Sequence, residues 1–178
     1  MSGAIMFSVG TFKSSAPPTP LIIPLNSDGG LTGWGAGAAS IPWSPTTIAT
    51  YPVGTSITWY DNTRVTISMW DNYGPTYIDI FWTPAKSGQL FPMVLGLSAS
   101  AKIIPTNEAG GLTGWGAQNA SFPAAGNSTL IATYPVGTKI TFRDNTTSTV
   151  TEWGDYGSYI DIGWLGAKTG NIFPIVLG

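Results

Sequence analysis

The side chains of this sequence that could perform acid–base chemistry are carboxylates that occur in pairs. Asp61 and Asp144 each begin an Asp-Asn-Thr segment, and Asp79 and Asp161 each lie between two isoleucines. Two carboxylates can hydrolyse a glycosidic bond, but these spacings indicate neither a cleft nor a raised pKa. The sequence contains no His and no Cys, which excludes thiol nucleophiles, imidazole bases, Ser-His-Asp triads and zinc clusters. We therefore predict no catalytic residues, no metal, no cofactor and no enzymatic activity.

Each carboxylate pair has a structural explanation. An aspartate that begins a short polar loop commonly caps the turn with its side chain, as expected for Asp61 and Asp144. An acidic residue on a partly apolar strand face needs a hydrogen-bonding or charged partner. Lys86 and Lys168 are the basic positions shared by both halves of the chain. We therefore expect them to pair with Asp79 and Asp161, respectively. A calcium site built from Asp61, Asp71 or Asp79 is an alternative, although their spacing matches no EF-hand loop.

The segment GGLTGWGA occurs twice, at Gly29–Ala36 and Gly110–Ala117. Its glycines would let a ligand approach the tryptophan closely, and a sugar ring can stack on an indole. This predicts possible glycan-binding residues in each copy: Trp34, Trp115, Tyr73 and Tyr156. In the alternative interpretation the glycines form tight turns or bulges and the tryptophan belongs to a core or an interface.

These segments belong to a duplication that covers most of the chain. IATYPVGT at 48–55 returns at 131–138, and YIDI at 77–80 returns at 159–162. The repeat divides the sequence into an N-terminal arm, a first copy, a short linker and a second copy. Their ranges are 1–20, 21–96, 97–101 and 102–178.

Within each copy, short β-branched and aromatic runs alternate with Gly, Pro and Asn turn signals, a pattern typical of sandwiches and barrels. Alternation at 55–60 and 64–70 predicts a hairpin. Further strands are expected in both copies, for the first at 21–26, 46–51, 76–82 and 90–95. The predicted fold is all-β, with two tandem, homologous small β-sandwich or barrel lobes and an extended N-terminal arm. Lobes this small should share an interface.

The charge content restricts the partners. Charged residues make up 9% of the 178 residues, against about 25% in an average soluble protein, so we expect a surface covered by partners. The seven basic residues are scattered and the formal net charge is -2, which argues against nucleic-acid binding. No apolar run approaches the roughly 18 residues that cross a bilayer, and the first ten residues lack secretory features. We expect a virion protein made in the host cytoplasm, or an extracellular one if the sequence is a processed mature form.

The first twenty residues match neither copy. Ile5, Phe7 and Val9 alternate with smaller residues, Phe12 follows them, and Ala16–Pro20 contains three prolines that favour a stiff, extended spacer. Such an arm is either a frayed tail or a strand added to a sheet. We favour addition to a neighbouring subunit.

The function predicted from these features is structural. A non-enzymatic protein of a symmetric assembly, a viral (phage) capsid decoration or minor capsid protein, would bind neighbouring subunits through its arm and uncharged aromatic-rich surfaces. Specific interfaces are depleted in charge and enriched in aromatic residues. The partners would be subunits of the same homo-oligomer, such as a trimer, and the capsid lattice. The alternative is a carbohydrate-binding lectin with one site per repeat around the GGLTGWGA loops.

Overall fold

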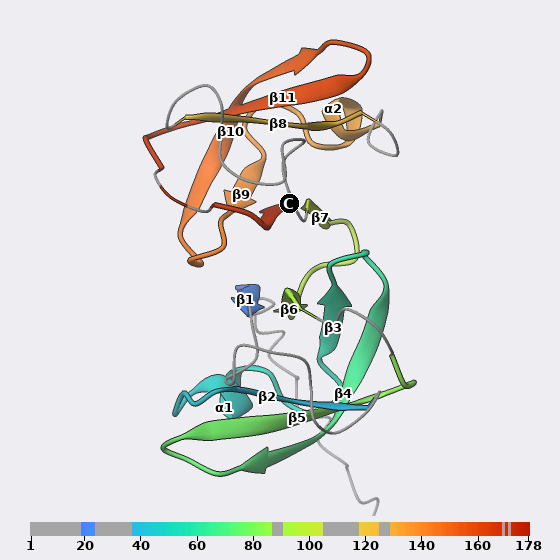
Figure 1. Ribbon diagram of the computed structural model, residues 1–178, viewed down its shortest axis with the longest axis vertical. Coiled ribbons are helices and arrows are strands. Elements are labelled where there is room, and N and C mark those ends of the chain that lie inside the picture. Colours follow the sequence, from blue (N-terminus) through green and yellow to red (C-terminus); the bar gives the residue numbers. More distant parts are fainter. Residues whose placement is uncertain are drawn as a thin grey trace, which may run out of the picture.

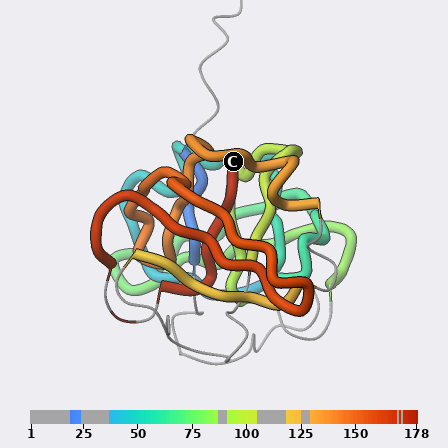
Figure 2. Tube along the Cα trace, turned by 90° about the horizontal axis from the view of Figure 1, so that it is seen from above, coloured from blue at the N-terminus to red at the C-terminus, as the bar shows by residue number. Residues whose placement is uncertain are grey.

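The protein is described by a computed structural model that covers residues 19–23, 37–86, 91–104, 118–124, 129–168, 170 and 172–178. The described chain forms two lobes stacked along the long axis of the molecule (Figure 1). Lobe 1 contains strands β1 to β6, and lobe 2 contains β7 to β12. Viewed along the long axis, the traces of the two lobes overlap (Figure 2).

Lobe 1 is a curled six-stranded antiparallel sheet with the strand order β1-β6-β3-β4-β5-β2. Its described elements are β1 Leu21–Ile23, β2 Ala38–Pro42, α1 Thr47–Thr50, β3 Ser56–Trp59, β4 Arg64–Asn72, β5 Tyr77–Thr83 and β6 Met93–Leu95. The first two strands of the chain therefore lie at opposite ends of the sheet.

Lobe 2 is a second curled sheet, and its order β7-β12-β9-β10-β11-β8 follows that of lobe 1 position for position. Its described elements are β7 Lys102–Ile104, β8 Asn119–Pro123, α2 Leu130–Thr133, β9 Lys139–Thr141, β10 Thr147–Asp155, β11 Tyr159–Trp164 and β12 Ile175–Leu177. The predicted all-β class with two β lobes is confirmed. Within the described ranges, no helix has the length and hydrophobicity that a bilayer crossing requires.

Each lobe encloses its own hydrophobic core, to which the strands contribute alternate residues. Lobe 1 centres on Trp59, which meets Trp82 edge to face at 4.9 Å between ring centroids. In lobe 2, Phe142 and Trp164 form the corresponding pair at 5.3 Å. In lobe 1, the face of β4, β5 and β2 that points away from the core is available for other contacts. The same is true of β10, β11 and β8 in lobe 2.

The lobes meet through four three-residue strands, β1, β6, β7 and β12, which gather midway along the molecule (Figure 1). Their middle residues, together with two residues of the linker, form a separate buried cluster: Ile22, Val94, Ile103, Val176, Leu97 and Ala101. Flanking residues such as Met93 and Leu95 face the core of their own lobe. Because both faces are covered, these strands are apolar without polar alternation, apart from Lys102 at the start of β7.

Two asparagine side chains connect the lobes in a reciprocal manner. The amide of Asn62 accepts from the Ile103 backbone N–H at 2.7 Å and donates to the Ile103 carbonyl at 3.0 Å. Asn145 makes the same two bonds with Ile22, at 2.6 and 3.0 Å. Each asparagine lies at a hairpin turn with positive φ, 64° and 63°, a conformation that asparagine tolerates better than most residues. Each lobe therefore caps the outer strand of the other.

One predicted strand is wrong. Residues 46–51 do not form a strand, because Thr47–Thr50 is the single-turn helix α1, with Tyr51 N–H donating to Thr47 O at 2.9 Å. The helical turn places Ile48 and Tyr51 on the core, since positions three apart share a helix face. The indole of Trp70 then donates to the Tyr51 carbonyl at 2.9 Å. The sequence pattern also missed β2.

Candidate functional site

The residues predicted from sequence fall into two groups. The predicted residues of the arm and of the GGLTGWGA segments lie outside the described residues. They are Ile5, Phe7, Val9, Phe12, Trp34 and Trp115. Tyr73 and Tyr156 are described, and each follows the long strand of its lobe with 46% and 58% of its surface exposed. Both rings stack on a neighbouring tyrosine, Tyr73 on Tyr77 at 5.0 Å and Tyr156 on Tyr159 at 4.8 Å. Each lobe therefore presents one exposed tyrosine stacked on a half-buried one.

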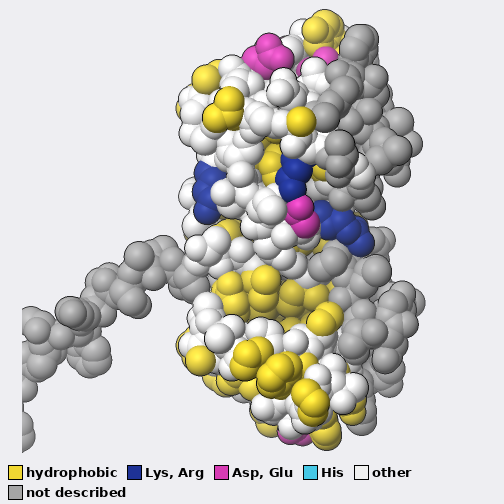
Figure 3. Space-filling model, turned by 90° about the vertical axis from the view of Figure 1, so that its left-hand side faces the viewer, with side chains coloured by type: hydrophobic (Ala, Val, Ile, Leu, Met, Phe, Trp, Pro, Cys, Tyr) yellow, Lys and Arg dark blue, Asp and Glu magenta, His cyan; other side chains and the backbone are white. Residues whose placement is uncertain are grey.

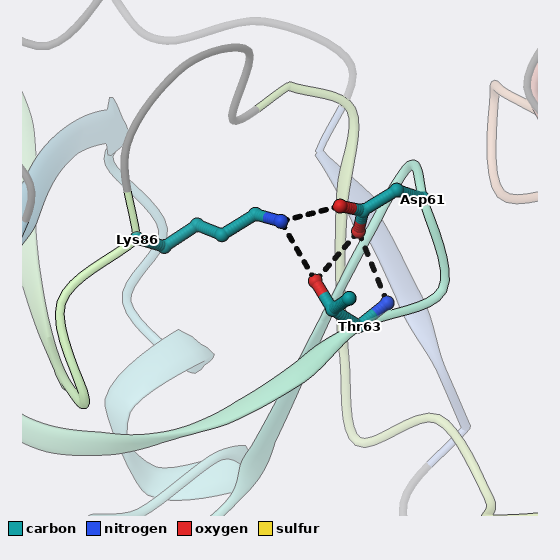
Figure 4. Close-up of polar contacts among 3 residues, drawn as sticks. All are labelled: Asp61, Thr63 and Lys86. Atoms are coloured by element: carbon teal, nitrogen blue, oxygen red, sulfur yellow. Dashed lines mark hydrogen bonds and ion pairs between the residues drawn. The ribbon is translucent and has the colours of Figure 1, made fainter.

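Asp61 and Lys86 form an ion pair at the hairpin turn, as Asp144 and Lys168 do in lobe 2. Asp61 Oδ1 also accepts from the backbone N–H and the hydroxyl of Thr63, at 3.0 and 2.6 Å (Figure 4). These contacts confirm the predicted turn caps. Partial burial opposes ionisation of both aspartates, but the hydrogen bonds from lysine and threonine outweigh it. The pKa of Asp61 is lowered, and that of Asp144 falls to about 2.

The predicted pairing of Asp79 with Lys86 and of Asp161 with Lys168 is therefore wrong. Asp79 is 2% exposed, and its Oδ1 accepts from the Ser40 hydroxyl at 2.6 Å. Asp161 has the same partner type, since the Ser121 hydroxyl donates to its Oδ1 at 2.5 Å. The serine lies directly across the strand pair from the aspartate, whereas both lysines reach the hairpin turn.

An apolar groove of about 230 Å³ lies between the two ends of the lobe 1 sheet. Its lining is Leu21, Ile22, Ile23, Ile41, Pro42, Trp43, Ser44 and Thr47. The face of the molecule drawn in Figure 3 shows hydrophobic side chains gathered on lobe 1, the lower lobe, next to the junction. At the sequence-matched position of Leu21, lobe 2 carries Lys102. The two lobes therefore differ in the polarity of this edge.

A second hollow, the lobe 2 cleft, lies on the outer face of β10, β11 and β8. It has a volume of about 300 Å³ and is lined by Asn119, Glu152, Trp153, Gly154, Tyr156, Tyr159, Asp161 and Gly163. Two glycines on its floor are covered by neighbouring side chains. A Cβ atom at Gly163 would lie 2.4 Å from Cγ of Glu152, and one at Gly154 would lie 2.7 Å from the Tyr156 ring. Both side chains therefore lie across glycine backbone.

The structure brings Tyr156 into this cleft together with residues that the sequence reasoning missed, namely Asn119, Glu152 and Gly163. That reasoning examined positions at which the two copies agree. The missed residues are positions at which they differ, since lobe 1 has Ala38, Met69 and Phe81 there. Comparing the copies for differences in polarity would have found them.

Among the described residues, no group of three or more His, Cys, Asp or Glu side chains could hold a metal ion. The chain matches no protein-family model, no curated protein and no solved structure.

Proposed function

We propose that the protein is a non-enzymatic structural subunit of a symmetric assembly, a virion component of the capsid decoration or minor capsid type. In this proposal, residues 5–12 of one copy dock in the lobe 1 groove of the next copy. The observation that carries the proposal is the apolar groove between the ends of the lobe 1 sheet. Its lining offers almost no polar partner, so its occupant must be apolar.

The chemistry of the arm fits this groove. Ile5, Phe7 and Val9 alternate along the sequence, so an extended arm would direct all three side chains to one face. At about 3.3 Å per residue, the 18 residues before Thr19 can span about 60 Å. That length is sufficient to reach a neighbouring molecule.

The occupant should come from another copy for two reasons. Pro17, Pro18 and Pro20 immediately precede β1, and a proline-rich run disfavours the tight reversal that would bring the arm back along its own β1. The outward backbone groups of Ile22 on β1 are also already bonded to Asn145. An added strand would therefore pair with β2, which occupies the other end of the sheet.

A head-to-tail contact of this kind closes into a ring when the rotation between copies allows it. Three copies of a two-lobed chain would present six similar lobes, which suits a sixfold or quasi-sixfold lattice. The low charge content of the chain agrees with a surface that is largely covered.

The test is the solution mass by light scattering of the full chain and of a variant lacking residues 1–18. This deletion keeps Thr19, whose carbonyl accepts from the Tyr51 hydroxyl at 2.6 Å. We expect the full chain to be an oligomer and the deletion variant a folded monomer. A peptide of residues 1–18 should bind the monomer, whereas a peptide with serine at 5, 7, 9 and 12 should not.

Leu21→Lys is the matched control for the groove. Lys102 at the matched position shows that lobe 2 accommodates a lysine there. The variant should keep its fold and lose assembly, because a charge at the groove opposes docking of apolar side chains. An unchanged oligomer mass after deletion of 1–18 would refute the arm's role.

A further inference from the structure

On the outer face of lobe 2, residues that lie opposite one another on the neighbouring strands β8, β11 and β10 form rows across the sheet. Asn119, Gly163 and Glu152 form the first row. Ser121, Asp161 and Gly154 form the second row. In the third, Tyr159 on β11 lies beside the ring of Tyr156, with an angle of 15° between the ring planes.

Lobe 1 provides an internal comparison, because its sheet has the same order and matching register. Its second row keeps serine and aspartate, Ser40 and Asp79, and its third row keeps the stacked tyrosines. The third member of the second row differs, because lobe 1 has Asp71 where lobe 2 has Gly154. The first row differs at all three positions, which are Ala38, Phe81 and Met69 in lobe 1.

The change in this row alters the environment of the central aspartate. Asp79 of lobe 1 lies next to the row that contains Phe81, and it is 2% exposed. Asp161 is only half-buried, and Gly163 stands next to it in place of the phenylalanine, with the Glu152 side chain across its backbone. The carboxylate of lobe 2 can therefore meet a ligand, whereas that of lobe 1 is covered.

The lining of the lobe 2 cleft has a clear chemical bias. Its first two rows offer hydrogen-bond acceptors, the Glu152 and Asp161 carboxylates and the amide oxygen of Asn119. Asn119 Oδ1 has almost no accessible surface and meets no donor among the described residues. Because an unsatisfied buried acceptor is costly, a turn of this side chain towards the cleft would be favoured when a ligand hydroxyl donates to it. The third row offers the faces of aromatic rings. No Lys or Arg lines the cleft.

The spacing of these groups indicates an extended ligand. Gly163 and Tyr159 are four residues apart on β11, which corresponds to about 13 Å along a strand. A point cation such as an ammonium would reach one end only. A pyranose ring and its neighbour carry several hydroxyl donors together with apolar C–H faces, so they can satisfy the acceptors and cover a tyrosine ring simultaneously.

We propose that the lobe 2 cleft binds a neutral saccharide of one or two hexose units, with Asn119, Glu152 and Asp161 accepting from its hydroxyls and Tyr156 packing against a ring face. In lobe 1, Phe81 and Met69 occupy the row that the ligand would use. The proposal does not depend on assembly through the arm.

The probes are the neutral disaccharides cellobiose, maltose, lactose and mannobiose, titrated into the full chain and followed by ligand-observed NMR. We expect at least one to bind, with little dependence on salt concentration. The decisive variant is Asn119→Ala/Glu152→Met/Gly163→Phe, which copies the first row of lobe 1 into lobe 2. This variant should fold and bind at least roughly tenfold more weakly, and Tyr156→Ala should weaken binding similarly.

Two controls use lobe 1. Tyr73→Ala removes the matching exposed tyrosine and should leave binding unchanged. Ala38→Asn/Met69→Glu/Phe81→Gly should add a second site.

If the triple variant of lobe 2 folds and binds undiminished, the saccharide site lies elsewhere and the proposal is overturned. It is also overturned if no disaccharide binds at millimolar concentration, or if n-butylammonium binds in a salt-sensitive manner while the neutral sugars do not.

Discussion

Replacing Asn62 tests whether the asparagine caps hold the lobes together. The side chain makes two hydrogen bonds to the backbone of Ile103, which is fully buried. A hydrogen bond contributes about 1 kcal/mol net, and stranding a buried partner costs at least as much, so Asn62→Gly should lower the free energy of unfolding by about 2 kcal/mol. Asn62→Ala should lower it by about 3 kcal/mol, because alanine also strains at positive φ.

The assay is urea denaturation followed by both tryptophan fluorescence and far-ultraviolet circular dichroism. If the caps couple the lobes, loss of the cap should also separate the two probes, since lobe 1 and lobe 2 would then unfold at different urea concentrations. Asn145→Gly, at the equivalent turn, is the matched variant and should behave alike. A change below about 0.5 kcal/mol for both glycine variants, with coincident probes, would refute the reasoning, because surface substitutions commonly fall within that range.

Two further predictions concern single polar groups. The pKa of Asp144 is about 2, below its ordinary value of 3.8, so its ion pair with Lys168 stabilises the fold above pH 4 and loses this contribution as the pH falls towards 2. The difference in melting temperature between wild type and Asp144→Asn should therefore shrink as the pH falls from 4 to 2. A constant difference would contradict the assignment. Thr58 is fully buried beside Val94 at the junction, and its hydroxyl has no partner among the described residues. Thr58→Val should therefore raise the free energy of unfolding, measured by urea titration, by about 1 kcal/mol. A decrease would show that the hydroxyl is hydrogen-bonded.

The fold class followed from local patterns, but the connections between strands did not. Turn residues and β-branched runs were sufficient to predict two all-β lobes and the 55–60/64–70 hairpin. The strand at Ala38–Pro42 has a small, weakly patterned sequence, and it is a strand because β5 pairs along its full length. Residues 46–51 show the opposite error. Their β-branched composition favours a strand, but Pro45 precedes them and Tyr51 packs on the core, so the chain forms a helical turn instead.

The pairing of charges could not be predicted from sequence because it depends on where side chains end. Asp79 lies in the middle of a strand, and its nearest donor is the serine across the ladder. Lys86 follows the end of β5 and extends to the turn between β3 and β4. The same reasoning applies to Asn62, which appears in the sequence as an ordinary turn residue, although its amide binds the other lobe.

The positions that the two copies share are largely explained by the fold itself. Asp61 caps a turn, Trp70 bonds the carbonyl of Tyr51, and Asn62 caps a strand of the other lobe. Each has the same contact in lobe 2, so their identity requires no ligand. Identical residues in a chain with an internal sequence repeat are therefore weak indicators of a binding site.

The differences between the copies are more informative. The substitution of Phe81 by Gly163 removes a large apolar side chain from a β-sheet face, and the accompanying change of Met69 to Glu152 adds a charge beside it. A folding requirement alone would favour the apolar row, because glycine within a strand costs stability and offers no side chain to pack. All three changes lie in one cross-strand row and all increase its polarity or openness. The neighbouring row changes as well, since Gly154 of lobe 2 stands where lobe 1 has Asp71. A ligand with several hydroxyl groups that occupies this surface would explain the changes in both rows together.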